Sequence, residues 1–235
     1  MRLPLPEHLD VARVTRAVAT VRESMADTLR RYVVGPDGEE RARALMEAPG
    51  ERWYAEDRPI RRVHADASMF IGGLRALLLQ SLHPLAMAGV AQHSDYRTDP
   101  WGRLQRTADF LAVTTFGPAE MAERTIARIR DVHSRVVGTA PDGRPYSASD
   151  PHLLKWVHLA EVESFLVAHQ RFGERPLDQT GCDGYVADMA HVAEALGVER
   201  PPRTERELGT QLRAYKRELR STRESRDAEI GRAHV

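Results

Sequence analysis

The sequence of 235 residues is poor in cysteine, and this scarcity excludes two common ways of stabilising a fold. The single cysteine, Cys182, has no partner for an internal disulfide and cannot form a cysteine-rich zinc site. It lies in a loop-like TGCDG stretch, with no histidine at ligand spacing. We therefore interpret Cys182 as an ordinary free thiol in a reducing compartment.

An excess of either charge is also missing. The chain has 34 Lys and Arg against 34 Asp and Glu, so its formal net charge is zero and its pI is near 7.2. A general nucleic-acid binder normally shows a basic excess or a basic face. We therefore expect no nucleic-acid partner.

Long apolar runs are absent as well. The most apolar stretch, residues 71–91, is interrupted by Arg75, His83 and Pro84, whereas a membrane span needs about 20 nearly uninterrupted apolar residues. The N-terminal MRLPLPEHLD lacks the apolar core of a signal peptide. These features predict a cytoplasmic protein without stable membrane insertion.

Several enzyme motifs do not occur in the sequence. It contains no glycine-rich phosphate loop, GxSxG nucleophile elbow, HExxH zinc motif or CxxC pair. Hydrolase, kinase and dinucleotide-binding functions therefore have no support at this level.

Apolar residues recur at helical spacing through most of the chain, and no run of residues convincingly predicts a long strand. The expected fold is all-α, a single multi-helix globular domain in which amphipathic helices wrap central apolar ones. Asp142-Gly143 is a strong turn signal that predicts a small hairpin. The main predicted helices span residues 7–34, 39–48, 67–84, 85–92, 103–116, 118–137, 151–172, 185–196 and 206–226.

Local signals refine these helices. Residues 67–84 are apolar almost all round, which predicts a fully packed central helix, and Gly72-Gly73 permit a close helix approach or a kink. Gly138 is expected to end the helix that begins at Pro118. Two helix starts are also indicated, by Asp150-Pro151 and by a capping box of Thr204 with Glu207.

The chain divides into four predicted parts: an N-terminal helical segment (1–60), a helical core (61–208), a charged C-terminal helix (209–228) and a tail (229–235). The tail reads EIGRAHV and resembles a translated sequencing adapter. We interpret it as non-native sequence that follows a truncation.

Three polar residues lie on faces that should otherwise be apolar. Arg103 and Thr107 stand at i, i+4, and His133 falls between Ile129 and Val136. Inside a helical protein they would meet in a pocket. Spacing alone leaves each with two interpretations: His133 is a metal or haem ligand or a hydrogen-bonded core histidine, and Arg103 binds a ligand or forms a salt bridge.

A second group, His152, His158, Glu161 and Glu163, invites a di-iron interpretation. Di-iron helical bundles use Glu-x-x-His twice, with two further glutamates. Here the order is reversed and no second copy follows, so a di-iron site is disfavoured. His83 and His93 flank the loop after the most apolar helix, where they would line the mouth of a pocket.

Four phrases in this order resemble one family. They are RRVHADASMFIGGLRALLLQSLHPLAMAGVAQHS, DPWGRLQRTADFLAVTTFG, IRDVHSRVVG and YSASDPHLLKWVHLAEVES. Together they resemble the rubber oxygenase (latex-clearing protein) and MpaB-like oxygenase family. The resemblance implies an all-helical oxidoreductase that holds haem b, and hence iron, between its helices.

The resemblance also assigns roles. The family's Arg-x-x-His phrase matches Arg130 and His133, which makes His133 the iron ligand. Its Arg-x-x-Lys-Thr phrase matches Arg103, Arg106 and Thr107, with Arg in place of Lys. Arg103 and Thr107 would bind a propionate or act in catalysis on the distal side, supported electrostatically by Arg106 and Arg130. The family's further arginine one turn after the ligand is replaced here by valine, at position 137.

The expected function is a haem b-dependent oxygenase that acts with O₂ on a small, apolar, unsaturated substrate. The helices of residues 71–91 are expected to supply the apolar pocket. The alternative is a helical protein that binds haem or a hydrophobic ligand without turnover, and a purely structural role for the histidines comes third.

Overall fold

The computed structural model describes residue 35, residues 37–94 and residues 97–233, with side chains through residue 228. The helix predicted for residues 7–34 lies outside this part of the chain. The described helices and strands are α2 (Gly38–Glu47), α3 (Pro59–Ala65), α4 (Ser68–Ser81), α5 (Pro84–His93), α6 (Pro100–Phe116), α7 (Ala119–Arg135), β1 (Val137–Thr139), β2 (Pro145–Ser147), α8 (Pro151–Phe172), α9 (Gln179–Leu196), α10 (Glu205–Tyr215) and α11 (Arg223–Ala233).

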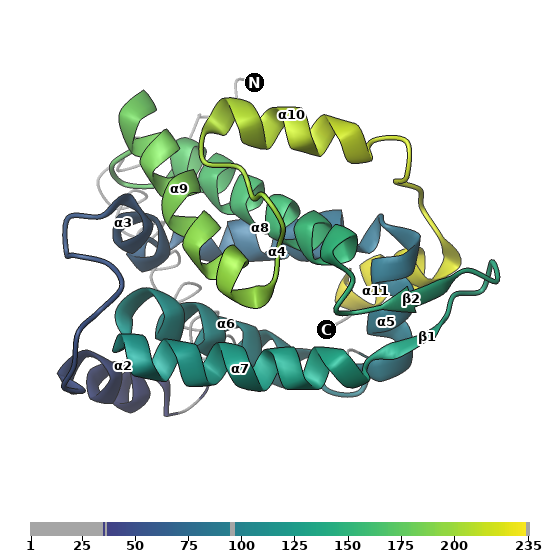
Figure 1. The fold of residues 1–235 in the computed structure, drawn as a ribbon, viewed down its shortest axis with the longest axis horizontal. Coiled ribbons are helices and arrows are strands. Elements are labelled where there is room, and N and C mark those ends of the chain that lie inside the picture. Colours follow the sequence, from purple (N-terminus) through teal and green to yellow (C-terminus); the bar gives the residue numbers. More distant parts are fainter. Residues whose placement is uncertain (1–34, 36, 95–96, 234–235) are drawn as a thin grey trace, which may run out of the picture.

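The architecture is all-α, as predicted, apart from the small hairpin of β1 and β2. In Figure 1, α6 and α7 lie side by side beneath α8 and α9, and α10 crosses above them. Within the described residues no single helix is long and apolar enough to cross a membrane. Of the helix pairs in the described parts of the chain, α4 and α5 together meet that test by length and composition, and they are bent by 105°.

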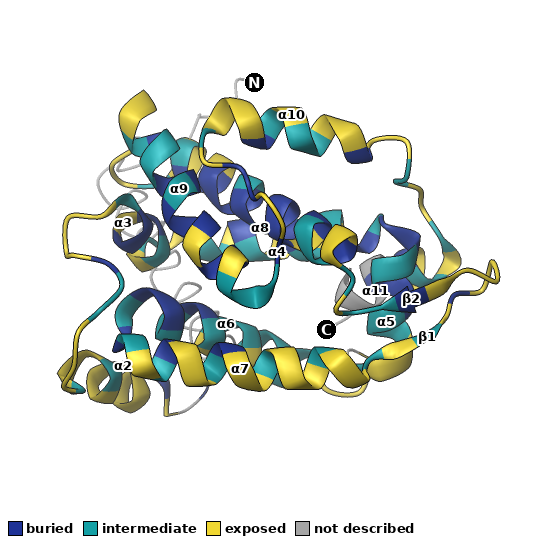
Figure 2. Ribbon diagram, in the orientation of Figure 1, coloured by how far each residue is buried: buried dark blue, intermediate teal, exposed yellow. Residues whose placement is uncertain are grey.

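The core centres on α8, the longest of the described helices. Trp156, Leu159 and Val162 are completely buried there, and Figure 2 shows much of α8 in dark blue while the outer faces of α7 and α10 are yellow. The helix begins where Asp150 accepts a hydrogen bond from the His152 backbone N–H at 2.8 Å, as the Asp-Pro signal predicts. Because α8 carries polar residues on several turns, the core contains ionisable side chains as well as apolar ones.

One face of helix α4 packs tightly against α8. A Cβ added to Gly72 would stand 3.0 Å from the Phe165 Cα, so this glycine permits the close approach that the sequence indicates. On the opposite face Ile71, Leu74 and Leu78 are exposed by 46%, 47% and 41%. The prediction that α4 is packed on all sides is therefore wrong. An apolar composition does not say how many neighbours a helix has.

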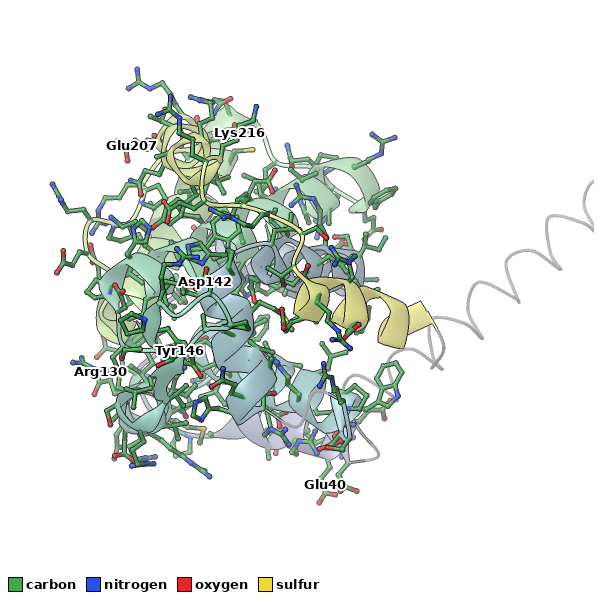
Figure 3. The ribbon with its side chains drawn as sticks, turned by 90° about the vertical axis from the view of Figure 1, so that its right-hand side faces the viewer. Glu40, Arg130, Asp142, Tyr146, Glu207 and Lys216 are labelled. Carbon is green, nitrogen blue, oxygen red and sulfur yellow. The ribbon has the colours of Figure 1, made fainter. Side chains whose placement is uncertain are left out.

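The predicted hairpin is confirmed, with antiparallel pairing that includes Gly138 and Tyr146. Tyr146 points into a small cluster with Ala88, Ala140 and Leu153, and Asp142 and Tyr146 are labelled in Figure 3. The expected role of Gly138 as a helix terminus is wrong, because α7 ends at residue 135. Glycine stands at 138 because an added Cβ would come within 2.5 Å of the Tyr146 hydroxyl.

The charged C-terminal segment is not one helix. Helix α10 ends at Tyr215, which is buried, and the Arg220 backbone N–H donates to the Leu82 carbonyl at 2.9 Å. Thr222 and Ser225 then form a reciprocal cap at the start of α11. The single helix predicted across residues 206–226 is wrong because tertiary contacts interrupt it where the local sequence has no breaker. The four-part division of the chain stays a prediction.

Candidate active site

A small cavity lies where α3, α6, α7, α8 and α9 meet, with a volume of about 80 Å³. Its walls are largely apolar and include Phe110 and Leu111 from α6, Met189 and Val192 from α9, and Leu154 and Val157 from α8. Four polar side chains with ligand or acid–base chemistry also line it: His64, His133, His158 and Glu161.

His64 is held in place by two hydrogen-bond partners. Its Nδ1 lies 2.7 Å from the Thr115 hydroxyl and its Nε2 lies 3.3 Å from the Tyr185 hydroxyl. Burial lowers the pKa of His64 to about 3. The ring is therefore a neutral, fixed part of the wall at ordinary pH.

His158 and Glu161 share one face of α8, as their i, i+3 spacing predicts, and both face the cavity. His158 is 6% exposed, and its Nε2 is a buried polar atom without a hydrogen-bond partner. An unpaired buried nitrogen is unfavourable, since buried polar groups in proteins are nearly always bonded. Burial, aided by Lys155, lowers the pKa of His158 to about 3.

Glu161 is the one carboxyl of the cavity wall. Burial raises its pKa from 4.5 to about 7, because the apolar surroundings disfavour the charged form. Its carboxylate also contributes to the raised pKa of the neighbouring Tyr185 hydroxyl, after burial of that hydroxyl. A carboxyl that titrates near neutrality can both hold and release a proton.

His133 reaches the cavity from the last turn of α7. It is half-buried, and desolvation lowers its pKa. The ring is therefore largely neutral at pH 7, the form in which imidazole binds a metal. The predicted position of His133 on an inward face agrees with this geometry.

The residues predicted to join His133 lie elsewhere. Arg103 donates to the Ser94 hydroxyl at 3.0 Å, and the Thr107 hydroxyl donates to the Arg103 carbonyl at 3.1 Å. Neither is part of the cavity wall. Arg106 is exposed and pairs with Asp99 at 3.4 Å. The structure does not bring these residues together with His133.

Arg130 stands one turn before His133 on α7. It is exposed, and its guanidinium donates to the Ala195 carbonyl at 3.3 Å near the end of α9. Its label in Figure 3 lies at the periphery of the molecule. Since Leu196 lines the cavity, Arg130 places a positive charge near the rim.

The other histidines suggested by the sequence do not reach the cavity. His93 lies 3.0 Å from the Tyr146 hydroxyl, and His83 and His152 both contact Glu218. Glu163 forms an ion pair with Arg75. A di-iron site that combines His152, His158, Glu161 and Glu163 is therefore not formed.

Two features of the site escaped sequence reasoning. His64 stands in a mixed stretch between aromatics and charges, where no apolar period marks it as inward-facing. The expected contribution of residues 71–91 to the apolar wall is wrong, because α3, α6, α7, α8 and α9 supply it. The i, i+3 spacing of His158 and Glu161 and the position of His133 on the apolar stripe were the local signals that pointed to the right faces.

Small-molecule sites in helical proteins are commonly apolar pockets between helices that carry a few polar side chains, and this cavity has those features. The sequence profile of the family described as ER-bound oxygenase mpaB/B'/rubber oxygenase, catalytic domain, matches residues 61–233. The chain belongs to this family and is an oxygenase, an oxidoreductase. The comparison with curated proteins and with solved structures gives no match.

Proposed function

We propose that the protein is a haem b-dependent oxygenase that acts with O₂ on a small, apolar, unsaturated substrate in the cavity of His133 and His158. The observation that carries this proposal is the unpartnered, buried Nε2 of His158 facing an apolar space that His133 also lines. Unpartnered buried polar atoms are uncommon in proteins, and a bound water, ion or ligand is one explanation of them, so this atom supports a group bound in the cavity.

The donor set favours haem over a bare ion. Within the described residues, the ligand atoms of His64, His133, His158 and Glu161 do not form a group of three within 4.8 Å of one another. A bare zinc or iron ion needs several protein ligands in its first shell, whereas haem iron needs only one proximal histidine. Imidazoles spread over an apolar wall therefore suit a large planar cofactor.

The cavity must widen to admit haem. Its volume of about 80 Å³ is below the roughly 300–1,000 Å³ of most ligand pockets. Figure 1 shows α6 and α7 as one layer and α8 and α9 as another. Side chains from both layers line the cavity, as does His64 of α3, so separation of the two layers is the movement that would enlarge it.

In this proposal His133 would hold the iron of the cofactor, and the exposed guanidinium of Arg130 would offer its positive charge to a carboxylate of the cofactor. Bound haem supplies an iron at which O₂ is activated. Glu161 holds or releases a proton near pH 7. Neutral His158 offers its unpartnered Nε2 for a hydrogen bond without adding charge, while His64 is already bonded to Thr115 and Tyr185. The apolar walls exclude water and accept an apolar substrate. Catalytic roles for Arg103 and Thr107, and support from Arg106, stay predictions.

The test is an absorption spectrum of the purified protein with and without added haemin, followed by oxygen consumption with a panel of apolar alkenes. We expect a Soret band and alkene-dependent oxygen uptake. Protein that neither retains nor takes up haemin would refute the haem proposal. Haem binding without oxygen uptake on any alkene would refute the proposed substrate class and leave the cofactor assignment standing.

A further inference from the structure

A second cluster of ligand-type side chains lies outside the cavity, where three distant segments of the chain meet. His83 caps α5, His152 lies in the first turn of α8, and Glu218 follows the end of α10. One ring nitrogen of His83, one of His152 and a carboxylate oxygen of Glu218 all lie within 4.8 Å of one another. We call these three residues the corner triad.

We propose that the corner triad is a binding site for a divalent transition-metal ion of the zinc type, which fastens the C-terminal segment to the helical core. In the described part of the chain, no other set of three histidine, cysteine or acidic side chains brings its ligand atoms so close together. The proposal is independent of the haem proposal, because none of the three residues lines the cavity.

The distances suit a small ion. With metal–ligand bonds of about 2.0–2.2 Å, two ligand atoms on a tetrahedral zinc ion stand roughly 3.4 Å apart. The His83 Nε2 lies 3.3 Å from the Glu218 Oε2, and the His152 Nε2 lies 2.8 Å from the same oxygen. Only the His152 ring and the carboxylate need to shift, and both are partly exposed, whereas His83 is fixed by burial.

The surroundings fix the ligands in the manner of a metal site. The Tyr215 hydroxyl lies 3.2 Å from the His152 Nδ1, and the rings of these two residues stack at 4.5 Å. Trp156 lies against the His83 ring, with centroids 6.1 Å apart. Partners that orient the second nitrogen of a ligating histidine, together with an apolar wall, are typical of metal sites.

The hydrogen bonds of His83 indicate where its ring proton lies. The His83 Nδ1 accepts a hydrogen bond from the Ala86 N–H, so in the neutral ring the Nε2 carries the proton and donates it to Glu218. Metal binding displaces this proton to solvent or to the Nδ1. Loss of the Ala86 contact costs little, because at 3.5 Å it is long. The nearby Arg144 is already paired with Asp142 at 2.7 Å, which reduces its repulsion of a cation.

A ligand set of two imidazoles and one carboxylate favours zinc over calcium and magnesium. This set is the zinc ligand set of several metal-dependent proteases, with a fourth position left for water. Calcium and magnesium prefer all-oxygen sites and are not expected to compete. The site would hold the turn after α10 against the corner between α4 and α5, next to the hydrogen bond from the Arg220 N–H to the Leu82 carbonyl.

The test uses the full chain, purified without a polyhistidine tag, freed of metal with a chelator and titrated with zinc chloride in a calorimeter. We expect one equivalent to bind and to raise the Tm by about 5 °C. His152→Ala and Glu218→Gln should each weaken binding at least tenfold. His93→Ala, which alters a histidine outside the triad, and His133→Ala, which alters the cavity, should leave zinc affinity unchanged.

X-ray absorption of the zinc-loaded protein supplies a second readout that does not depend on the variants. The proposal predicts nitrogen and oxygen neighbours at about 2.0–2.2 Å and no sulfur. It would be overturned if the wild-type chain bound no zinc, if Glu218→Gln bound zinc as well as wild type, or if a sulfur neighbour pointed to Cys182 instead.

Discussion

The cavity and the corner triad use the same kinds of side chain in opposite ways. In the cavity, imidazoles and one carboxyl are spread over an apolar wall, and the His158 Nε2 has no partner. In the corner triad two imidazoles converge on the Glu218 carboxylate at 2.8 and 3.3 Å. Dispersed donors with an unpaired atom suit a large group that must be brought in, while converging donors suit a single ion.

Helix α8 connects these two regions, since it carries His152 at its start and His158 and Glu161 two turns further on. Residue type alone therefore does not determine whether a histidine lines a cavity or joins a cluster of ligand atoms. The side chains that other helices bring next to it determine its role. We therefore expect substitutions in the cavity to leave zinc binding at the corner triad intact, and substitutions in the corner triad to leave haem binding intact, unless they disturb α8 itself.

The largest effect is expected for His133→Ala. Removal of the proposed iron ligand should abolish the Soret band and lower alkene-dependent oxygen uptake about 100-fold or more, while zinc binding at the corner triad persists. Added imidazole should restore part of the band by occupying the vacated position. His93→Ala is the control. Full haem retention by His133→Ala would contradict the assignment of the cavity as the haem site and of the corner triad as a separate metal site.

The next largest effect is expected for Glu161→Gln. A carboxyl whose pKa rises from 4.5 to about 7 on folding is favoured in its protonated form. Its stabilising contribution is complete below pH 4.5 and is lost as the pH rises to 7. The variant should therefore unfold less readily than wild type at pH 8, by up to about 3 kcal/mol, and match it near pH 4.

Urea unfolding of both proteins across this pH range measures the difference. The difference isolates Glu161, because His64 and His158 titrate in both proteins. Glu163→Gln is the matched control, since Glu163 lies two residues away on α8 and pairs with Arg75 instead. Equal stability of wild type and Glu161→Gln at pH 8 would contradict the assignment of a carboxyl whose pKa is raised by desolvation.

A smaller effect that reaches both regions is expected for Gly72→Ala. The added Cβ would meet the Phe165 ring at 2.6 Å and force α4 away from α8, at a cost of about 1–3 kcal/mol. Gly73→Ala is the control, because its Cβ would find only an ordinary contact at 3.8 Å. Thermal unfolding should separate the two variants, and Gly72→Ala should weaken both haem and zinc binding. No difference between them would show that the close contact is absent.

The smallest effect is expected for Asp150→Ala, which removes the N-cap of α8 and should lower stability by about 1 kcal/mol. Because His152 receives this cap on its backbone N–H, zinc affinity should fall slightly as well. Asp178→Ala removes the equivalent cap of α9, where the carboxylate accepts from the Gly181 N–H at 2.7 Å. Asp178→Ala should lower the free energy of unfolding by a similar amount, measured by chemical unfolding, and should leave zinc affinity unchanged, measured by calorimetry.

Local signals in the sequence predicted local structure well. The Asp-Pro start of α8, the Asp142-Gly143 turn and the shared face of His158 and Glu161 are all confirmed. The Thr204 cap of α10 is confirmed too, although the Glu207 carboxylate accepts from the Arg203 N–H rather than closing on Thr204 itself. Each of these features depends on residues within one helical turn or one hairpin.

Features that depend on distant segments were not predictable in the same way. The exposed face of α4 and the break after Tyr215 are set by neighbours that no local period encodes. Spacing placed Arg103 and Thr107 on one face but not against the cavity. Glu218 contacts two histidines that are distant from it in the sequence, and a charged helical pattern gives no hint of that contact.

Haemin titration, followed at the Soret band for wild type, His133→Ala and His152→Ala, tests the central claim most directly. We expect wild type and His152→Ala to bind one equivalent of haem each. His133→Ala should bind no haem that gives a comparable Soret band. Equal binding by wild type and His133→Ala, or loss of haem in His152→Ala alone, would contradict the assignment of the cavity as the haem site.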